Sequence, residues 1–278
     1  MIPNIRGGVR RPGRAALGAA LTALALASAV PASATASTVQ LQEMTWTEVR
    51  EALRAGSTTV IIPVGGTEQS GPHIALGKHN YRVMALADRI AARLGNALVA
   101  PVVSYVPEGR VTPPAGHMRF PGTISVPDDA FAGILAGAAR SFRQQGFLNV
   151  VLIGDHGGYQ GQLKDVAQKL NREWASSPAR VHYVPAYYRA QSEGFSQALR
   201  ARGLTDAQIG SHAGAADTSL MLAVDPGRVR ADRLQPGDEA STGISGDPSK
   251  ASAALGKIGI DMAVDQAVEA IRKAIEKH

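Results

Sequence analysis

The chain alternates short apolar, β-branched runs with longer runs in which apolar residues recur at helical spacing. Strands are predicted over residues 58–64, 97–106, 149–155 and 180–188. Helices are predicted over residues 45–56, 82–95, 128–146, 162–175, 216–224 and 261–278, and several of them end at a glycine. Strands that alternate with helices need crossover connections. The pattern therefore predicts an α/β fold, a three-layer α/β/α sandwich with a mainly parallel sheet covered on both faces.

The first 34 residues differ in composition from the rest. They contain four arginines and no acid, then an apolar run over 15–30, and they end at Pro31-Ala32-Ser33-Ala34. This order is typical of a signal peptide, and the run is too short and alanine-rich for a stable membrane-spanning helix. Arg10-Arg11 resembles a twin-arginine signal. We expect a signal peptide over 1–34, one domain over 35–278, and an exported periplasmic or secreted protein that leaves the membrane after cleavage.

Charge and cysteine content exclude several classes of partner and site. The formal net charge is +6, but removing the four signal arginines leaves 25 basic against 23 acidic residues, a net charge of +2. Basic residues are interspersed with acids and aromatic residues make up only 5% of the chain, so nucleic acid is not expected as a partner. The chain has no cysteine, which excludes thiolate metal sites and cysteine nucleophiles.

Histidines gather in turn-forming sequence next to two predicted strand ends. Five of the seven lie in glycine- or proline-rich stretches, namely His73, His79, His117, His156 and His212. Glu68 follows the first predicted strand and His156 follows the third. Carboxyl ends of parallel strands meet at one edge of a sheet, where ligands bind. The backbone of Gly157-Gly158 would either stabilise an oxyanion or form a plain strand-to-helix turn.

Four motifs in order resemble those of the creatininase (creatinine amidohydrolase) family. "PVGGTEQSGPHIALGKHN" is similar to the family's Pro-Val-Gly-Ser-x-Glu-Gln-His-Gly-Pro-His-Leu-Pro-Leu-x-Thr-Asp, and it is followed by "GHMRFPGTISV", "GDHGGYQG" and "SHAGAADTSLML". The match extends over residues 45–225. The resemblance implies a three-layer α/β/α fold, frequent hexamers, and a metal centre that hydrolyses C–N bonds in cyclic amides, formamides or small peptides.

The resemblance also implies a ligand set, and this chain changes it. Usual members bind two divalent metals, with an aspartate as the bridge. Here Glu68 and His156 are kept, Ser70 stands where a ligand histidine is expected, and His79 replaces the bridging aspartate. An imidazole offers one nitrogen per metal and cannot bridge as a carboxylate does. We therefore expect one divalent metal per chain, zinc, manganese or iron, held by Glu68, His79 and His156 with an open position for water.

Other residues of the motifs receive roles around this metal. The resemblance makes His212 a proton-transfer candidate. Asp217 would orient His212, supply a metal ligand or cap the following helix, and Asp155 would orient His156 or begin the turn. Gly157 and Gly158 would stabilise the oxyanion. Candidates for contact with substrate are Ser70, His73, His117 and Tyr159.

These expectations define a metal-dependent hydrolase acting on a small amide, lactam or related C–N bond, or on a lactone C–O bond. Its partner would be a small-molecule substrate, and it would form a homo-oligomer, with a hexamer as the family pattern. Two alternatives stay open: a protein that binds a small molecule without turnover, and a metal-dependent isomerase or lyase on a sugar-like substrate. The polar segment 234–252 is expected to be a surface loop or a lid.

Overall fold

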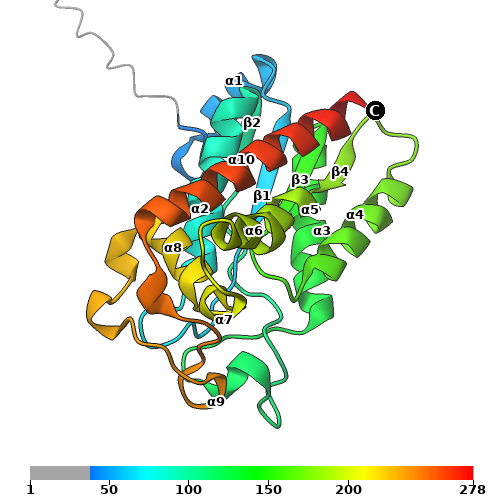
Figure 1. Ribbon diagram of the computed structural model, residues 1–278. Coiled ribbons are helices and arrows are strands. Elements are labelled where there is room, and N and C mark those ends of the chain that lie inside the picture. Colours follow the sequence, from blue (N-terminus) through cyan, green and yellow to red (C-terminus); the bar gives the residue numbers. More distant parts are fainter. Residues whose placement is uncertain (1–37, 278) are drawn as a thin grey trace, which may run out of the picture. The chain divides into compact units, whose positions relative to one another are not determined.

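A computed structural model describes residues 38–277, and its centre is a parallel sheet of four strands (Figure 1). The strand order is β2-β1-β3-β4. The strands are β1 (Thr59–Val64), β2 (Ala97–Val99), β3 (Asn149–Gly154) and β4 (Arg180–Tyr183). β1 pairs with β3 along its whole length, from Thr59 opposite Asn149 to Val64 opposite Gly154. The two strand ends are thus level at one edge of the sheet.

Alternate side chains of the strands build two separate cores, one on each face of the sheet. Ile61 of β1 and Val151 of β3 belong to one buried cluster, whereas Val60 and Val150 belong to the other. The first cluster packs on α2 (Lys78–Leu94), α5 (Pro185–Arg189), α6 (Phe195–Arg200), α8 (Ala215–Val224) and α10 (Ala253–Glu276). The second packs on α1 (Trp46–Arg54), α3 (Asp128–Gln145) and α4 (Gln160–Glu173). These layers confirm the predicted α/β/α class.

Most predicted elements are present, with shifted ends. α1 begins at a Thr45–Glu48 capping box, and α3 ends at Gly146 with a left-handed φ of 108°. The expectation of a helix from residue 82 was wrong at its start: α2 begins at Lys78, so His79 lies on a helix rather than on a loop. The predicted strands over 97–106 and 180–188 were too long, because β2 ends at Val99 and Pro185 starts α5.

Several short elements were not predicted. They are α5, α6, α7 (Asp206–Ile209), the π-helical turn Ala190–Gly194, and 3-10 turns at Leu41–Glu43, Gly116–Arg119, Pro226–Arg228, Ala231–Arg233 and Pro248–Lys250. The segment 234–252 also contains α9 (Glu239–Thr242). It is joined to the sequence before α8 by the bridge between His212 and Ser245.

The predicted signal peptide lies outside the described residues and stays a prediction. Within residues 38–277, none of the helices is both long enough and apolar enough to cross a membrane.

Candidate metal centre

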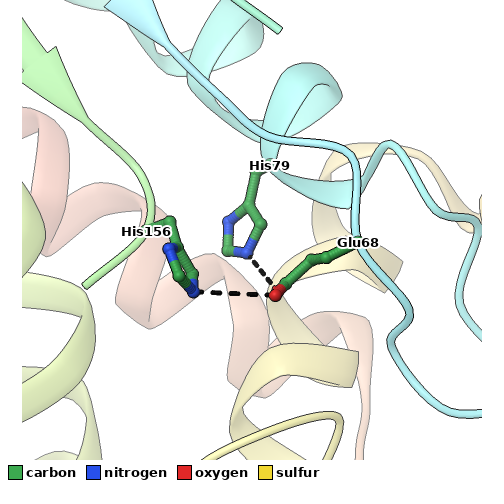
Figure 2. Close-up of side chains that lie close together, drawn as sticks. All are labelled: Glu68, His79 and His156. Carbon is green, nitrogen blue, oxygen red and sulfur yellow. Dashed lines mark hydrogen bonds and ion pairs between the residues drawn. The ribbon is translucent and has the colours of Figure 1, made fainter. Parts of the chain in front are cut away.

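Side chains from three segments meet at the carboxyl ends of β1 and β3, beside a cavity of about 450 Å3 (Figure 2). Glu68 comes from the loop after β1, His79 from the first turn of α2, and His156 from the turn after β3. This is the edge at which parallel α/β sheets place their ligand sites. The sequence-based expectation that these three residues share one site agrees with their positions.

The Glu68 carboxylate is the centre of the cluster and is fully buried. Its Oε1 lies 2.8 Å from His79 Nε2, and its Oε2 lies 3.6 Å from His156 Nε2. The three ligand atoms lie within 4.8 Å of one another, close enough to hold one metal ion. Oε2 has no hydrogen-bond partner among the described residues. A buried acceptor without a donor calls for a missing cation or water, so the donor set fits a divalent metal.

His79 is held in the orientation that a metal ligand requires. Its Nδ1 lies 2.7 Å from Asp155 Oδ2, and a carboxylate oxygen only accepts, so Nδ1 carries a proton. Nε2 lies 2.8 Å from Glu68 Oε1, which also only accepts, so this contact needs either a proton on Nε2 or a metal ion in its place. Asp155 is itself fixed by Arg82 Nε and by the Tyr187 hydroxyl, both at 2.7 Å. This carboxylate–histidine pair is the usual support of a metal-bound imidazole.

Asp155 therefore has a different partner from the expected one. We predicted that it orients His156, but its carboxylate contacts His79 instead. His156 precedes Gly158, whose N–H donates to His156 Nδ1 over 3.2 Å. The same Nδ1 lies 3.5 Å from Glu108 Oε2. Because Nδ1 accepts from Gly158, neutral His156 carries its proton on Nε2, the atom that faces Glu68, and a metal ion bound there would replace that proton.

Glu108 is a residue of the site that sequence reasoning missed. Its side chain is buried, and neither carboxyl oxygen has a hydrogen-bond partner among residues 38–277. Burial, with the nearby Glu68 charge, raises its pKa to about 9. Gly66 makes room for it, because a Cβ at Gly66 would lie 2.3 Å from Glu108 Oε1. The positive φ of Gly66, 155°, also suits only glycine.

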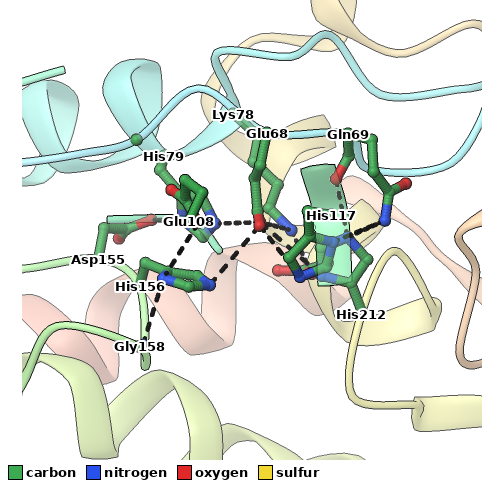
Figure 3. A network of polar contacts seen from close by, with 12 residues as sticks. Glu68, Gln69, Lys78, His79, Glu108, His117, Asp155, His156, Gly158 and His212 are labelled. Atoms are coloured by element: carbon green, nitrogen blue, oxygen red, sulfur yellow. Dashed lines mark hydrogen bonds and ion pairs between the residues drawn. The ribbon is translucent and has the colours of Figure 1, made fainter. Parts of the chain in front are cut away.

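Two further histidines lie on the other flank of Glu68 (Figure 3). His117 Nε2 is 3.3 Å from Glu68 Oε2, and His212 Nδ1 is 3.8 Å from Oε1. With Glu68 they form a second group of three residues that could hold a metal. Their outer nitrogens both meet Gln69: His117 Nδ1 lies 2.8 Å from the amide nitrogen, and His212 Nε2 lies 2.9 Å from the main-chain oxygen.

The orientation of the Gln69 amide decides the proton positions on this flank. Its Oε1 accepts from the Gly71 N–H over 3.0 Å, and its Nε2 donates to the Gly243 oxygen over 3.3 Å. The amide nitrogen therefore donates to His117 Nδ1, and neutral His117 carries its proton on Nε2, facing Glu68. His212 has the opposite tautomer, since its Nε2 must donate to a carbonyl oxygen. Its Nδ1 is left unprotonated.

Two buried cations complete the centre. Lys78 Nζ lies 2.8 Å from Asp217 Oδ2 and 3.3 Å from Glu68 Oε1. Arg82, one turn further along α2, donates to Asp217 Oδ1 over 3.0 Å. Burial raises the pKa of Glu68 and of Asp217, but Lys78 outweighs it in both cases, helped by His79 at Glu68 and by Arg82 at Asp217. Both carboxyl pKa values are therefore well below their ordinary range. The two acids are ionised at neutral pH.

The other predicted site residues divide into two sets. His117, Asp155, Gly157, His212 and Asp217 line the cavity. Of the alternatives for Asp217, the helix cap was wrong, because Asp217 lies inside α8, which has no side-chain cap hydrogen bond. Its carboxylate accepts from the Ala213 N–H and pairs with Lys78 and Arg82.

Three expected substrate contacts, Ser70, His73 and Tyr159, are buried away from the described lining of the cavity. His73 Nε2 lies 2.9 Å from the Thr218 hydroxyl. The Tyr159 hydroxyl accepts from the main-chain N–H groups of Asp155 and His156, both over 3.1 Å, so it fixes the turn after β3. The structure does not place these three residues at the cavity, and their contact with substrate stays a prediction. Gly158, expected to stabilise an oxyanion, uses its N–H on His156.

The fold and the site together define a class, that of α/β/α proteins with a buried carboxylate–histidine centre suited to a catalytic divalent metal. The family model for creatininase, described as creatinine amidohydrolase, matches residues 42–271. The chain belongs to the creatininase family.

Individual relatives agree with this assignment at low identity. The mycofactocin precursor peptide peptidase of Mycobacterium tuberculosis is 27% identical over 248 residues, 80% of this chain and 87% of the peptidase. The creatinine amidohydrolase of Pseudomonas putida is 27% identical over 252 residues, 83% of this chain and 95% of that enzyme. A solved mutant creatininase of the Zn-Zn type has a TM-score of 0.71 and 26% identity, covering 86% of this chain and 99% of its own. These relatives are hydrolases, with different substrates.

Proposed function

We propose that the protein is a metal-dependent hydrolase that cleaves a C–N bond of a small amide or lactam, or the C–O bond of a lactone, with one divalent metal per chain. Glu68, His79 and His156 would hold the metal. The observation that carries the proposal is the chain of contacts from Asp155 through His79 to the buried Glu68, because it turns Nε2 of the ring toward an ionised carboxylate, where a metal ion would replace the proton between the two. A cavity of about 450 Å3 suits a small substrate.

The residues around the metal would divide the chemistry. A bound divalent metal polarises a carbonyl group and makes water a nucleophile near neutral pH. His212 presents an unprotonated Nδ1 toward Glu68, which is the state in which a general base must start. Burial, together with the Lys78 charge, lowers its pKa to about 3, so His212 would pass a proton on to the leaving group rather than keep it. Gly157, which lines the cavity, is our candidate for the oxyanion donor.

The test combines metal analysis with a substrate panel. The protein without residues 1–34 is stripped of metal, refilled with zinc, manganese or iron, and assayed on cyclic amides, lactones, formamides and short peptides. We expect activity that depends on the metal and is lost in Glu68→Gln, which keeps the shape of the side chain but not its charge. A protein that binds metal and the compounds of the panel without turnover would instead support the binding protein. A protein that retains no metal would contradict the proposed centre.

Export and assembly are also proposals. We propose that residues 1–34 are removed on export and that the mature chain forms a homo-oligomer. Mass spectrometry of the mature N-terminus would test the first, and light scattering of the mature protein would test the second. An uncleaved chain or a monomer would contradict the respective proposal.

A further inference from the structure

Lys78 is a buried ammonium group placed between two carboxylates. Its side chain is 1% exposed, and Nζ lies 2.8 Å from Asp217 Oδ2 and 3.3 Å from Glu68 Oε1. Both neighbours are carboxylates, so the ammonium group makes an ion pair on each side. The side chain lines the same cavity as the candidate metal ligands.

The groups around the ammonium are of the kind that binds a divalent metal. Glu68 and Asp217 supply carboxylate oxygens, and the unprotonated Nδ1 of His212 lies 3.8 Å from Glu68 Oε1. Two carboxylates and an imidazole are a ligand set that zinc accepts. In this chain the point where the two carboxylates converge is filled by Nζ.

We propose that Lys78 is the built-in second cation of the centre: its ammonium occupies the position between Glu68 and Asp217 where a second divalent metal would bind, and so limits the site to one metal. This inference rests on the proposed metal site at Glu68, His79 and His156.

The charges of the cluster agree with one metal rather than two. Two side-chain cations face four carboxyl groups; they are Lys78 and Arg82 on one side and Glu68, Glu108, Asp155 and Asp217 on the other. Even with all four ionised, one divalent ion already makes the cluster neutral. A second would leave at least two uncompensated positive charges in a site mostly removed from water, where desolvation makes unpaired charge costly.

One N–H group of the Lys78 ammonium is left free to take part in the reaction. A lysine has three N–H donors, and the two carboxylates account for two of them. The third would reach the cavity, where a positive donor stabilises negative charge developing on a substrate oxygen. Lys78 would thus supply the electrostatic part of a second metal without its ligand-exchange chemistry.

Zinc titration of the metal-free protein against a competing chromophoric chelator tests the inference. Lys78→Met keeps the length of the side chain and removes the charge, and Lys78→Arg keeps the charge. We expect one zinc per chain for the wild type and for Lys78→Arg. For Lys78→Met we expect at least about tenfold tighter binding of the first zinc, because a positive neighbour is gone, and uptake of a second zinc.

Each result bears on a different claim. A folded Lys78→Met protein that binds one zinc with unchanged affinity overturns the inference and leaves the proposed function standing. Two zinc ions in the wild type overturn the inference and, of the proposed function, only the count of one metal per chain. A wild type that binds no zinc overturns the proposed function, and the inference with it. Circular dichroism checks the fold, and where Lys78→Met does not fold, Lys78→Gln, which still donates to Asp217, carries the same test. Lys257→Met, on the exposed side of α10, controls for loss of a positive charge elsewhere.

Discussion

Two histidines approach the Glu68 carboxylate from opposite flanks with the same atom but in different states. His79 Nε2 lies 2.8 Å from Oε1, and His117 Nε2 lies 3.3 Å from Oε2. The difference is on the far side of each ring. Asp155 accepts the Nδ1 proton of His79, whereas the Gln69 amide donates to Nδ1 of His117.

In the proposed centre, the outer hydrogen bond, and not the residue type, would decide which histidine binds the metal. His79 has a carboxylate acceptor behind its ring and turns Nε2 toward the position of the metal, whereas neutral His117 carries its proton on Nε2. Both candidate groups of three residues place an imidazole within reach of the same carboxylate. Of His79 and His117, only His79 has a carboxylate behind its ring that would support a bound metal.

The largest expected effect comes from removing the acceptor behind His79. Asp155→Asn should weaken zinc binding by about 10- to 100-fold, because the amide no longer fixes the tautomer of His79 as a carboxylate does. Chelator competition measures the affinity. Asp165→Asn, on the exposed side of α4, is the matched control, and equal affinities in the two variants would contradict this role of Asp155.

A smaller effect is expected at Glu108, beside His156. Glu108→Gln should weaken zinc binding about tenfold, since a bound divalent ion would favour the ionised form of Glu108 and an amide cannot supply that charge. The same titration applies, with Glu193→Gln on the π-helical turn as a control for loss of an acid. Tighter binding in Glu108→Gln would show that Glu108 opposes the metal rather than supporting it.

A third prediction changes Gln69, the residue whose side chain donates to Nδ1 of His117. Gln69→Glu places a carboxylate near Nδ1 of His117, and we expect the ring proton to move from Nε2 to Nδ1. Nitrogen NMR of labelled histidine, on the metal-free protein, reports which ring nitrogen is protonated. An unchanged tautomer would mean that Glu68, and not residue 69, sets the proton position.

The smallest effect concerns stability and uses His73, a buried histidine that faces the Thr218 hydroxyl. Burial lowers the pKa of His73 to about 4, against about 6.5 in an unfolded chain. Below pH 6.5 the unfolded chain binds the proton and the folded one does not, so stability falls from about pH 6.5 to about pH 4. Urea unfolding of the metal-free protein should show this fall, and His73→Gln should show a shallower one. Equal slopes would contradict the assignment.

The sequence predicted the layers and the core residues of the site, because both depend on local patterns. Strands over 58–64 and 149–155 are apolar runs, and their shared edge follows from parallel pairing, which brings Glu68 and His156 together. Family resemblance added His79 and His212. The start of α2 was missed because "GKHN" contains a glycine and an asparagine, weak helix formers whose cost tertiary packing overrides.

The partners of the ligands could not be predicted. Glu108 lies in a loop, and its approach to His156 depends on the space at Gly66. Asp155 neighbours His156 in sequence but turns to His79 because Arg82 and Tyr187 hold it there. Such contacts are set by tertiary geometry, for which residue spacing carries no signal. Spacing also gave no sign that the Tyr159 hydroxyl accepts from the backbone of the turn after β3 and does not line the cavity.

The central claim is that the flank of His79, and not the flank of His117, binds the metal. The most direct measurement is the zinc content of the metal-free protein after refilling, for wild type, His79→Ala and His117→Ala. The account predicts close to one zinc per chain in the wild type and in His117→Ala, and loss of the zinc in His79→Ala. Zinc retained in His79→Ala and lost in His117→Ala would contradict it.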